Sequence, residues 1–481
     1  MATNQETSQP TLAKGTLGTT SIAFFVVAAA APLFVMAGVA PLVIGFGGVG
    51  APSAYLIAGA ALAIFAVGFT AMTRYIHNAG AFYAYIARGL GSTAGIITAV
   101  VALVSYNVLE IGMFGALGQF TAGTVGKLTG LDVAWWVWAL IGVAIVWFLG
   151  SRSIHVGSQF LIALLCAETG ILVLLAGAVL IKGGATGLEA SSFAPSNVAT
   201  PSLGAMLTFA FAAFMGFEST ALYREEARKP DRTIPRATYI AVAFLGLFYA
   251  FMVWIGIEAF GPDKAQQAAN SDPAGMFFAA METYVGSWAS TLMEILIITS
   301  ILASLLAFHN AITRYAYSLS RESILPRVFG ELHPRHLSPF KTSGMQSLLA
   351  AAVVIVFALF RLDPLTQLMI WVNSPGVFGV VGMQVVVAVA VIAFFWRNRR
   401  GHSVFRVVVA PAVAAVVLLG ALGLMTKNIA LLTGVTPTFA PVNIAILAVM
   451  PITVVVGYLI AIRIRRTKPE IYAVVGQRDA E

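Results

Sequence analysis

Charged residues are scarce in this sequence. They make up 10% of the 481 residues, whereas 59% of the residues are hydrophobic. Soluble domains carry roughly 25% charged residues, so a water-soluble protein of this length could not cover its surface. Cysteine is also nearly absent, and the single Cys166 excludes an internal disulfide framework and a thiolate metal cluster. Residues 1–14 lack the basic start and short apolar core of a signal peptide, so we expect the first apolar segment to stay in the mature protein.

Long uncharged apolar stretches fill most of the remaining sequence. A spanning helix needs about 20 predominantly apolar residues, and the strand-like alternation of polar and apolar residues typical of membrane barrels is not seen. We therefore predict an all-α, polytopic membrane protein with about twelve transmembrane helices. The predicted spans cover residues 21–44, 52–73, 94–122, 134–151, 156–181, 203–223, 237–260, 286–316, 343–361, 365–395, 404–426 and 441–462.

The basic residues are distributed unevenly between the two sides of these spans. Of the 28 lysines and arginines, 23 fall on the side of the termini. The other side receives only Lys127, Lys182, Lys264, Arg361 and Lys427. Because basic loops stay in the cytoplasm, we expect cytoplasmic tails at 1–20 and 463–481 and location in the cell (inner) membrane. The same skew explains the net charge of +8 as anchoring beside anionic lipid, and we expect no nucleic-acid partner.

Two spans are interrupted near their middle. Pro32 follows four alanines in the first span, and Gly216 stands two residues before Glu218 in the sixth. Interrupted helices at matching positions of two halves indicate a transporter site. We therefore expect one repeat in residues 21–182, a second in 203–396, and two accessory helices in 404–462. A plain kink at Pro32 and close helix packing at Gly216 are the alternatives.

Four acidic residues fall inside the predicted spans without a lysine or arginine at comparable depth. They are Glu110, Glu168, Glu218 and Glu294. A carboxylate in the bilayer is costly, so each must be protonated, meet water or meet a transported cation, which is the chemistry of proton coupling. Glu294 lies nearer the outer end of its span, where it can simply reach water. For His309 in span eight we favour a hydrogen bond between helices.

A glycine-rich segment, Gly45–Gly50, matches the pattern of a dinucleotide-binding loop. That loop needs a preceding strand and an acidic residue about 20 positions later, and neither is present, so we interpret the segment as an external turn between two spans. No P-loop, zinc-protease or haem-attachment motif occurs. We expect no enzyme activity, cofactor or metal.

Three segments resemble the amino acid–polyamine–organocation superfamily of permeases. They are Gly216–Ala237 with Glu225-Glu226 and Ile234-Pro235-Arg236-Ala237, Asn310–Pro339 with Ser320-Arg321-Glu322 and His333-Pro334, and Gly80–Tyr85 with the following Gly89 and Gly91. The resemblance implies a LeuT-like fold with a 5+5 inverted repeat, discontinuous helices 1 and 6, two added C-terminal helices, and alternating access. In the loop after span six, the residues Arg224, Glu225, Glu226, Arg228 and Asp231 form either a gate network or a solvated charge run.

The resemblance also implies a substrate site at the two breaks. The residues implied are Ala29, Ala30, Ala31 and Pro32 at the first break, Phe214, Met215, Gly216, Phe217 and Glu218 at the second, and Tyr106, Asn107 and Glu110 of span three. Helix N-termini there would face an anionic group of the substrate. Alanine stands where many relatives have glycine at the first break, which leaves a polyamine open as substrate.

The function expected is secondary transport of amino acids or related amines. Candidate coupling residues are Glu168, Glu218 and Glu110 for protons, with substrate exchange as the other driving mode. A sodium-coupled permease is the alternative on the same fold, with Ser300 and Ser304 of span eight as hard-cation ligands. A membrane subunit of an energy-converting complex is a third hypothesis, which predicts co-purifying partner subunits.

Overall fold

Helices make up nearly all of the ordered structure. The computed structural model describes residues 17–76, 81–152, 158–223, 227–336 and 338–475. Within these ranges there is no β-strand, only an isolated bridge between Leu17 and Ala227. The all-α prediction is confirmed. Our predictions for residues 1–16, Gly80, Arg224–Glu226 and residues 476–481 lie outside the described residues.

The membrane-spanning character of the chain is also confirmed. In the part of the chain that the structure describes, ten segments are long and apolar enough to cross a membrane. The first of them, Thr19–Tyr75, contains two predicted spans, and the 17-residue apolar helix Trp135–Ser151 is another predicted span. Each of the twelve predicted spans therefore coincides with helical structure.

The first span is built from three short helices and the others mostly from one. The first comprises α1 (Thr19–Ala29), α2 (Pro32–Phe34), a π-helical turn (Val35–Val39) and α3 (Ala40–Gly47). The other spans are α4 (Ala51–Met72), α6 (Ser92–Thr129), α7 (Trp135–Ser151), α8 (Ser158–Lys182), α10 (Leu203–Ala213) with a 3-10 segment (Phe217–Tyr223), α11 (Pro230–Phe260), α14 (Ser287–Arg321), α15 (Phe340–Leu359), α16 (Ile370–Trp396), α17 (Ala410–Lys427) and α19 (Pro441–Thr467). Short helices connect them: α5 (Ala81–Leu90), α9 (Pro195–Val198), α12 (Pro262–Ser271), α13 (Met276–Tyr284), α18 (Ile429–Thr433) and α20 (Pro469–Val474).

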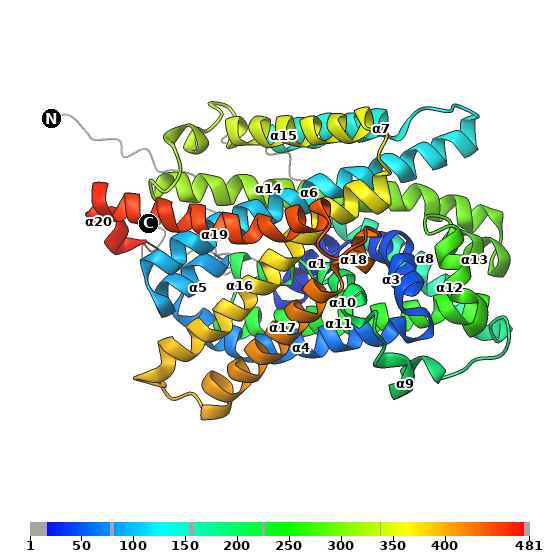
Figure 1. Cartoon of the computed structure of the whole chain (residues 1–481), viewed down its shortest axis with the longest axis horizontal. Helices are drawn as coiled ribbons and strands as arrows, with labels where there is room; N and C mark the ends of the chain where they lie inside the picture. The colour runs from blue at the N-terminus through cyan, green and yellow to red at the C-terminus, as the bar shows by residue number, and fades with distance from the viewer. Residues whose placement is uncertain (1–16, 77–80, 153–157, 224–226, 337, 476–481) are drawn as a thin grey trace.

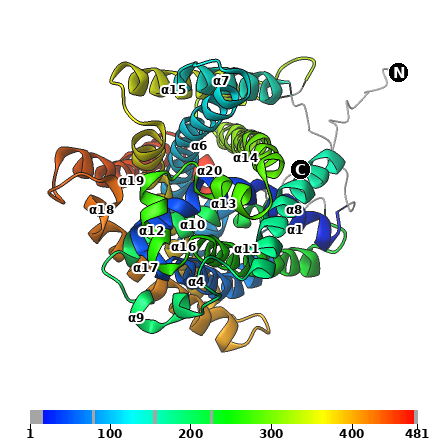
Figure 2. The ribbon, with the colours of Figure 1, turned by 90° about the vertical axis from the view of Figure 1, so that its right-hand side faces the viewer.

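The spans form one elongated bundle. In Figure 1 most of them run from left to right, with α5 and α20 at the left end and α12 and α13 at the right end. Figure 2 looks along the bundle: α10 lies near its centre, α7 and α15 form one edge, and α17, α18 and α19 form another. The interrupted α10 is therefore surrounded by other helices.

Several helices continue beyond the predicted spans, among them α19, which ends at Thr467 rather than residue 462. Helix α6 extends to Thr129 rather than residue 122, α14 to Arg321 rather than 316, and α11 begins at Pro230 rather than 237. Proline suits the first helical position because its missing N–H has no partner there in any helix. The added turns are more polar than the spans, so a pattern based on apolar residues alone omits them.

Helices α4 and α11 approach each other closely at two glycines. A Cβ atom placed on Gly59 would lie 3.2 Å from the Cα of Gly246, and one on Gly246 would lie 3.4 Å from the Cα of Gly59. Small residues at such crossings allow backbones to contact directly in membrane proteins. The two spans therefore pack without a side chain between them.

Large apolar side chains cover the outside of the bundle. On α15, Leu348 and Leu359 are 72% and 76% exposed, and on α19 Ile452 and Leu459 are 60% and 59% exposed. Such a surface would promote aggregation in water. In a bilayer the same side chains face lipid tails, which agrees with a multi-pass membrane protein.

Candidate functional site

The first span breaks between α1 and α2. Ala31 has a left-handed backbone conformation with φ 46°, and Pro32 begins α2. A left-handed alanine is uncommon because its Cβ crowds the backbone, so this conformation ends α1. The prediction of an interruption at Pro32 is confirmed, and Pro32 starts a new helix instead of only kinking one.

The sixth span breaks at Gly216. Helix α10 ends at Ala213, Gly216 has φ 103°, and the chain continues as a 3-10 segment from Phe217. Glycine adopts this conformation without the steric cost that a side chain brings. The second predicted interruption is therefore confirmed, and glycine is required here for its backbone conformation.

The two breaks lie side by side. A Cβ atom placed on Gly216 would lie 3.7 Å from the Cβ of Ala29. Residues 187 positions apart in the chain are thus separated by about the space that a methyl group would fill. This proximity brings the open ends of four half-helices to one place within the bundle.

Polar side chains hold the first break from three other helices. The Ser304 hydroxyl donates to the Ala29 carbonyl at 2.9 Å, and the Tyr249 hydroxyl donates to the Ala30 carbonyl at 3.3 Å. The buried carboxyl group of Glu168 accepts from the Ser300 hydroxyl at 2.7 Å and from the Leu33 backbone N–H. Glu168 therefore satisfies an N–H group at the start of α2, where the helix dipole favours negative charge.

The second break has its own carboxyl group. Glu218 is buried, and its two oxygens accept from the Tyr106 hydroxyl at 2.7 Å and from the Gly216 backbone N–H at 3.1 Å. Tyr106 thus connects α6 to the second break. Asn107, its neighbour, donates to the Leu103 carbonyl of its own helix at 2.7 Å.

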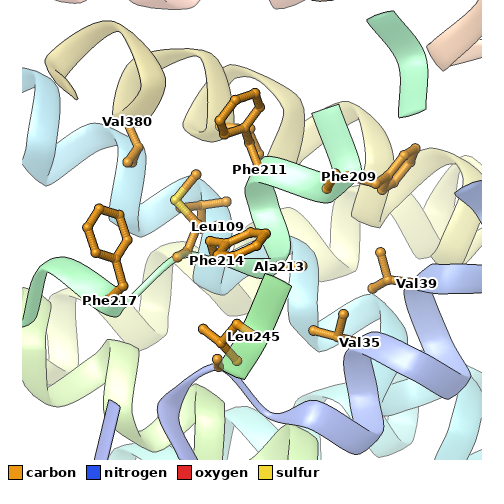
Figure 3. Close-up of a cluster of buried hydrophobic side chains, with 14 of the residues drawn as sticks. Val35, Val39, Leu109, Phe209, Phe211, Ala213, Phe214, Phe217, Leu245 and Val380 are labelled. Carbon is orange, nitrogen blue, oxygen red and sulfur yellow. The ribbon is translucent and has the colours of Figure 1, made fainter. Parts of the chain in front are cut away.

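A cavity of about 70 Å³ lies beside both breaks. One water needs roughly 10–15 Å³ of such space, so the cavity has room for roughly five to seven water-sized groups. Figure 3 shows Val35 and Val39 of the first span, Phe209 and Ala213 of α10, and Leu109 of α6 converging here. Its remaining lining residues are Ala29, Ala30, Phe34, Met113, Thr208, Ala212, Met215, Ser304, Phe308, Met369, Ile370, Asn373, Ser374 and Val377.

Among the predicted site residues, only some line this cavity. They are Ala29, Ala30, Met215 and Ser304. Phe214 instead packs against Tyr249, with ring centroids 6.3 Å apart, and Phe217 against Phe65 at 6.1 Å. Those not among the lining residues are Ala31, Pro32, Tyr106, Asn107, Glu110, Glu168, Phe214, Gly216, Phe217, Glu218 and Ser300.

Helix α16 contributes cavity residues that the sequence interpretation missed. The Asn373 amide nitrogen donates to the Leu109 and Val108 carbonyls at 2.9 and 3.0 Å in the amide orientation that satisfies both, and Ser374 donates to the Ile370 carbonyl at 2.6 Å. Asn373-Ser374-Pro375 interrupts a long apolar run, and this polar interruption was the signal that could have identified them.

Glu110 lies in a separate buried network. Its Oε1 lies 2.9 Å from Nδ1 of His309, its Oε2 accepts from the Gln346 amide, and Nε2 of His309 lies 2.7 Å from the Ser343 hydroxyl. The expectation that His309 forms a hydrogen bond between helices is confirmed. These side chains join α6, α14 and α15. None of these hydrogen bonds connects Glu110 to either break.

Replacing His309 by alanine should destabilise the protein by about 1–3 kcal/mol, because a buried acceptor of Glu110 loses its partner. The change would be measured as a lower midpoint of thermal unfolding in detergent. Asn310→Ala, one position along α14, is the matched control and should have a smaller effect. Equal midpoints for the two variants would contradict a stabilising role for the network.

Glu294 has a basic partner, contrary to our expectation. Its Oε1 lies 2.7 Å from Nζ of Lys127, because α6 extends far enough to place this lysine beside α14.

A further buried acid, Glu258 at the end of α11, was overlooked in the sequence analysis. It accepts from the Glu189 backbone N–H at 3.1 Å. Within the described residues, no group of three His, Cys, Asp or Glu side chains could hold a metal.

The remaining sequence motifs lie in the segments that connect the spans. Tyr83, from the segment after span two, donates to Oε1 of Glu322, from the loop after span eight, at 2.9 Å. Two of the segments that carry the family resemblance are therefore in contact. Arg228 donates its backbone N–H to the Leu17 carbonyl at 3.0 Å. Residues 45–47 form the end of α3, and only the 3-10 turn Gly48–Gly50 joins α3 to α4, so the predicted turn between spans is shorter than expected.

Comparison with curated proteins finds transporters. The low-affinity putrescine importer of Escherichia coli (strain K12) is 23% identical over 363 residues, which cover 73% of this chain and 75% of the importer. Two uncharacterized transporters of Mycobacterium tuberculosis are 31% identical over 143 residues (30% of this chain, 31% of theirs) and 28% identical over 246 residues (45% and 49%).

The family match covers far more of the chain than these pairwise alignments do. Residues 17–462 match the family described as amino acid permease. This range includes both breaks, the cavity and all twelve helical spans except the last five residues of α19. It confirms the resemblance to the amino acid–polyamine–organocation superfamily and a role in transport of amino acids or amines. The chain belongs to the amino acid permease family.

Proposed function

We propose that this protein is a proton-coupled secondary transporter of small amines or amino acids that works by alternating access. The observation that carries the proposal is the position of Glu168, which accepts from Ser300 on α14 and from Leu33 at the first break. Binding or losing a proton changes which of these groups the carboxyl can accept from. Whether the Glu168 carboxyl group carries a proton therefore affects the geometry of the first break.

We propose the cavity beside the breaks as the substrate site. Its lining contains no charged side chain, and its polar groups are Thr208, Ser304, Asn373, Ser374 and backbone atoms of the first break. Carbonyl and hydroxyl oxygens can accept from an ammonium group. The space for roughly five to seven water-sized groups suits a compact amine or amino acid and excludes long peptides.

Between these cargoes, a small diamine has the stronger support. In the permease fold the helix N-termini at the breaks would receive a substrate carboxylate. Here the Leu33 and Gly216 N–H groups already donate to Glu168 and Glu218. A substrate carboxylate would have to displace these two glutamate side chains from the N–H groups. The name of the putrescine importer, a relative with 23% identity, points in the same direction.

Sodium coupling is the second candidate mechanism. Ser300, Ser304 and the Ala29 carbonyl could supply oxygen ligands for a hard cation. Both serine hydroxyls donate to other oxygens in this structure, to Glu168 and to Ala29. They would have to turn before binding sodium, which favours the proton. We further propose that both termini face the cytoplasm, as the distribution of basic residues indicates.

The test is uptake of radiolabelled putrescine and alanine into proteoliposomes. We expect putrescine uptake to increase when an inward proton gradient is imposed at constant sodium and membrane potential. Alanine uptake in place of putrescine would reverse the choice of cargo. A response to sodium at constant pH would reverse the choice of ion, and no uptake of any amine or amino acid would refute the proposal.

A further inference from the structure

The turn that joins α16 to α17 carries a dense group of basic residues. Figure 1 shows this turn at the left end of the bundle, the end that also holds α5 and α20. Arg397, Arg399, Arg400, His402 and Arg406 lie within ten residues, and the side chain of Arg74, at the end of α4, is close enough to influence His402. We call Arg74, Arg400, His402 and Arg406 the basic cluster.

Aromatic rings fix part of the basic cluster in place. The guanidinium carbon of Arg400 lies 4.6 Å from the ring centroids of both Tyr75 and Phe394. Nε2 of His402 lies 3.2 Å from the Tyr75 hydroxyl, and its ring is 5.2 Å from Phe395. Cation–π contacts and a hydrogen bond therefore hold Arg400 and His402 against Tyr75.

The sequence segments that carry these charges contain no acidic residue. Neither residues 7–109 nor residues 364–469 contain an aspartate or glutamate. Among the described residues, no carboxylate forms an ion pair with Arg74, Arg400 or Arg406. Burial and the charges of Arg406 and Arg74 lower the pKa of His402, so both arginines are near enough to disfavour a positive charge on its ring.

Arg406 is in an unfavourable position for a cation. It is half-buried and lies in the first turn of the π-helical start (Phe405–Val409) of the α17 span. The positive end of a helix disfavours a basic side chain, and half-burial weakens its contact with water. A bound anion would offset the helix dipole, the repulsion among the cations and the lost hydration together.

Exposed aromatic side chains flank the cluster. Trp396 and Phe405 are 73% and 63% exposed, and each directly precedes an arginine. Aromatic side chains at the ends of spans lie at the membrane interface. An anion that binds here would therefore meet apolar side chains on one side and cations on the other.

From these contacts we propose that the basic cluster binds the phosphate of an anionic phospholipid, whose acyl chains lie against Trp396 and Phe405. The lipid would join α4 and α16 of the transport core to α17. Each basic residue near a membrane surface contributes about 1 kcal/mol to anionic lipid binding, so removing two of them corresponds to about 30-fold in affinity. This site does not depend on which cargo the protein carries.

The test measures binding of phosphatidylglycerol to the detergent-purified full chain, with phosphatidylcholine of the same acyl chains as the neutral lipid. We expect phosphatidylglycerol to raise the unfolding midpoint of the wild type more than phosphatidylcholine does. The double variant R400Q/R406Q should bind phosphatidylglycerol about 30-fold more weakly. The matched control R327Q/R335Q removes two exposed arginines from another basic loop and should keep wild-type affinity.

Three results would overturn the proposal. The first is equal stabilisation of the wild type by the two lipids, which needs no variant and so does not depend on whether R400Q/R406Q folds. The second is an equal loss of affinity in the control variant, since any two cytoplasmic arginines would then suffice. The third is full stabilisation by soluble glycerol phosphate, which would make the cluster a site for free phosphate.

Discussion

Replacing Glu168 by glutamine should abolish accumulation of substrate that is driven by a pH gradient alone. Glutamine matches glutamate in size, and its amide can still accept from the Leu33 N–H while donating to Ser300. The first break therefore keeps its partners, but the side chain no longer takes up or releases a proton. We expect uptake driven by the gradient to fall to the level of protein-free liposomes.

Exchange of substrate across the same membrane provides the internal control for Glu168→Gln. Counterflow with equal pH on both sides needs the cavity and both breaks but no net proton movement, so it should continue. Glu282→Gln removes an exposed acid on α13 and should leave both activities as in the wild type. Accumulation by Glu168→Gln at the wild-type level would remove Glu168 from the coupling mechanism.

Replacing Glu218 by glutamine should slow transport in every mode. The carboxyl group accepts from Tyr106 and from the Gly216 N–H. A glutamine that keeps the Gly216 N–H must turn its amide N–H toward the Tyr106 oxygen, so the Tyr106 hydroxyl proton loses its acceptor. Ser300, in contrast, can turn its hydroxyl to a backbone carbonyl of its own helix in Glu168→Gln. Leaving one buried donor without a partner costs about 1–3 kcal/mol, which lowers the population of the intact second break, and with it the transport rate, by up to about 5- to 150-fold. Initial uptake rates at low substrate concentration measure the effect.

Glu294→Gln is the matched comparison for Glu218→Gln. Glu294 is also a buried acid on a spanning helix, but its partner Lys127 is about half exposed and the pair lies away from both breaks. Partly exposed ion pairs contribute little, so the loss of transport should be much smaller. Equal rates for the two variants would remove the argument that acids at membrane depth serve transport.

The two breaks could be predicted from the sequence because their causes are local. Pro32 cannot continue a helix that precedes it, and a glycine at 216 permits a backbone conformation that other residues rarely adopt. The same holds for the spans, since each carries its apolar pattern within its own residues. The orientation of the chain in the membrane stays a prediction from the count of basic residues.

The partners of the buried acids could not be predicted, because they depend on packing between distant helices. Glu110 lies four residues from Tyr106 and Glu218 two residues from Gly216, yet only Glu218 bonds to a break. Glu110 faces His309 because of the way in which α6, α14 and α15 cross. The sequence of α6 alone does not specify this crossing. Similarly, Lys127 reaches Glu294 only because α6 continues past its apolar core.

The cavity lining was also only partly predictable. The residues near the breaks follow from the interruption itself, and Ala29, Ala30 and Met215 do line the cavity. Asn373 and Ser374 come from the tenth span, and nothing local specifies which other span they face. Their contribution depends on how α16 packs beside α6.

The contact between Gly59 and Gly246 limits which motions can open the cavity. A side chain at either position would meet the backbone of the other helix, so α4 and α11 keep this separation only with glycine at both positions. We expect the two helices to move together during the proposed cycle, so that the displacement that exposes the cavity occurs elsewhere in the bundle. The unwound turns at Ala31 and Gly216 are the natural hinges, because no continuous helical hydrogen bonding stiffens the chain there. A bulky residue at position 59 would therefore hinder the cycle from a place outside the cavity.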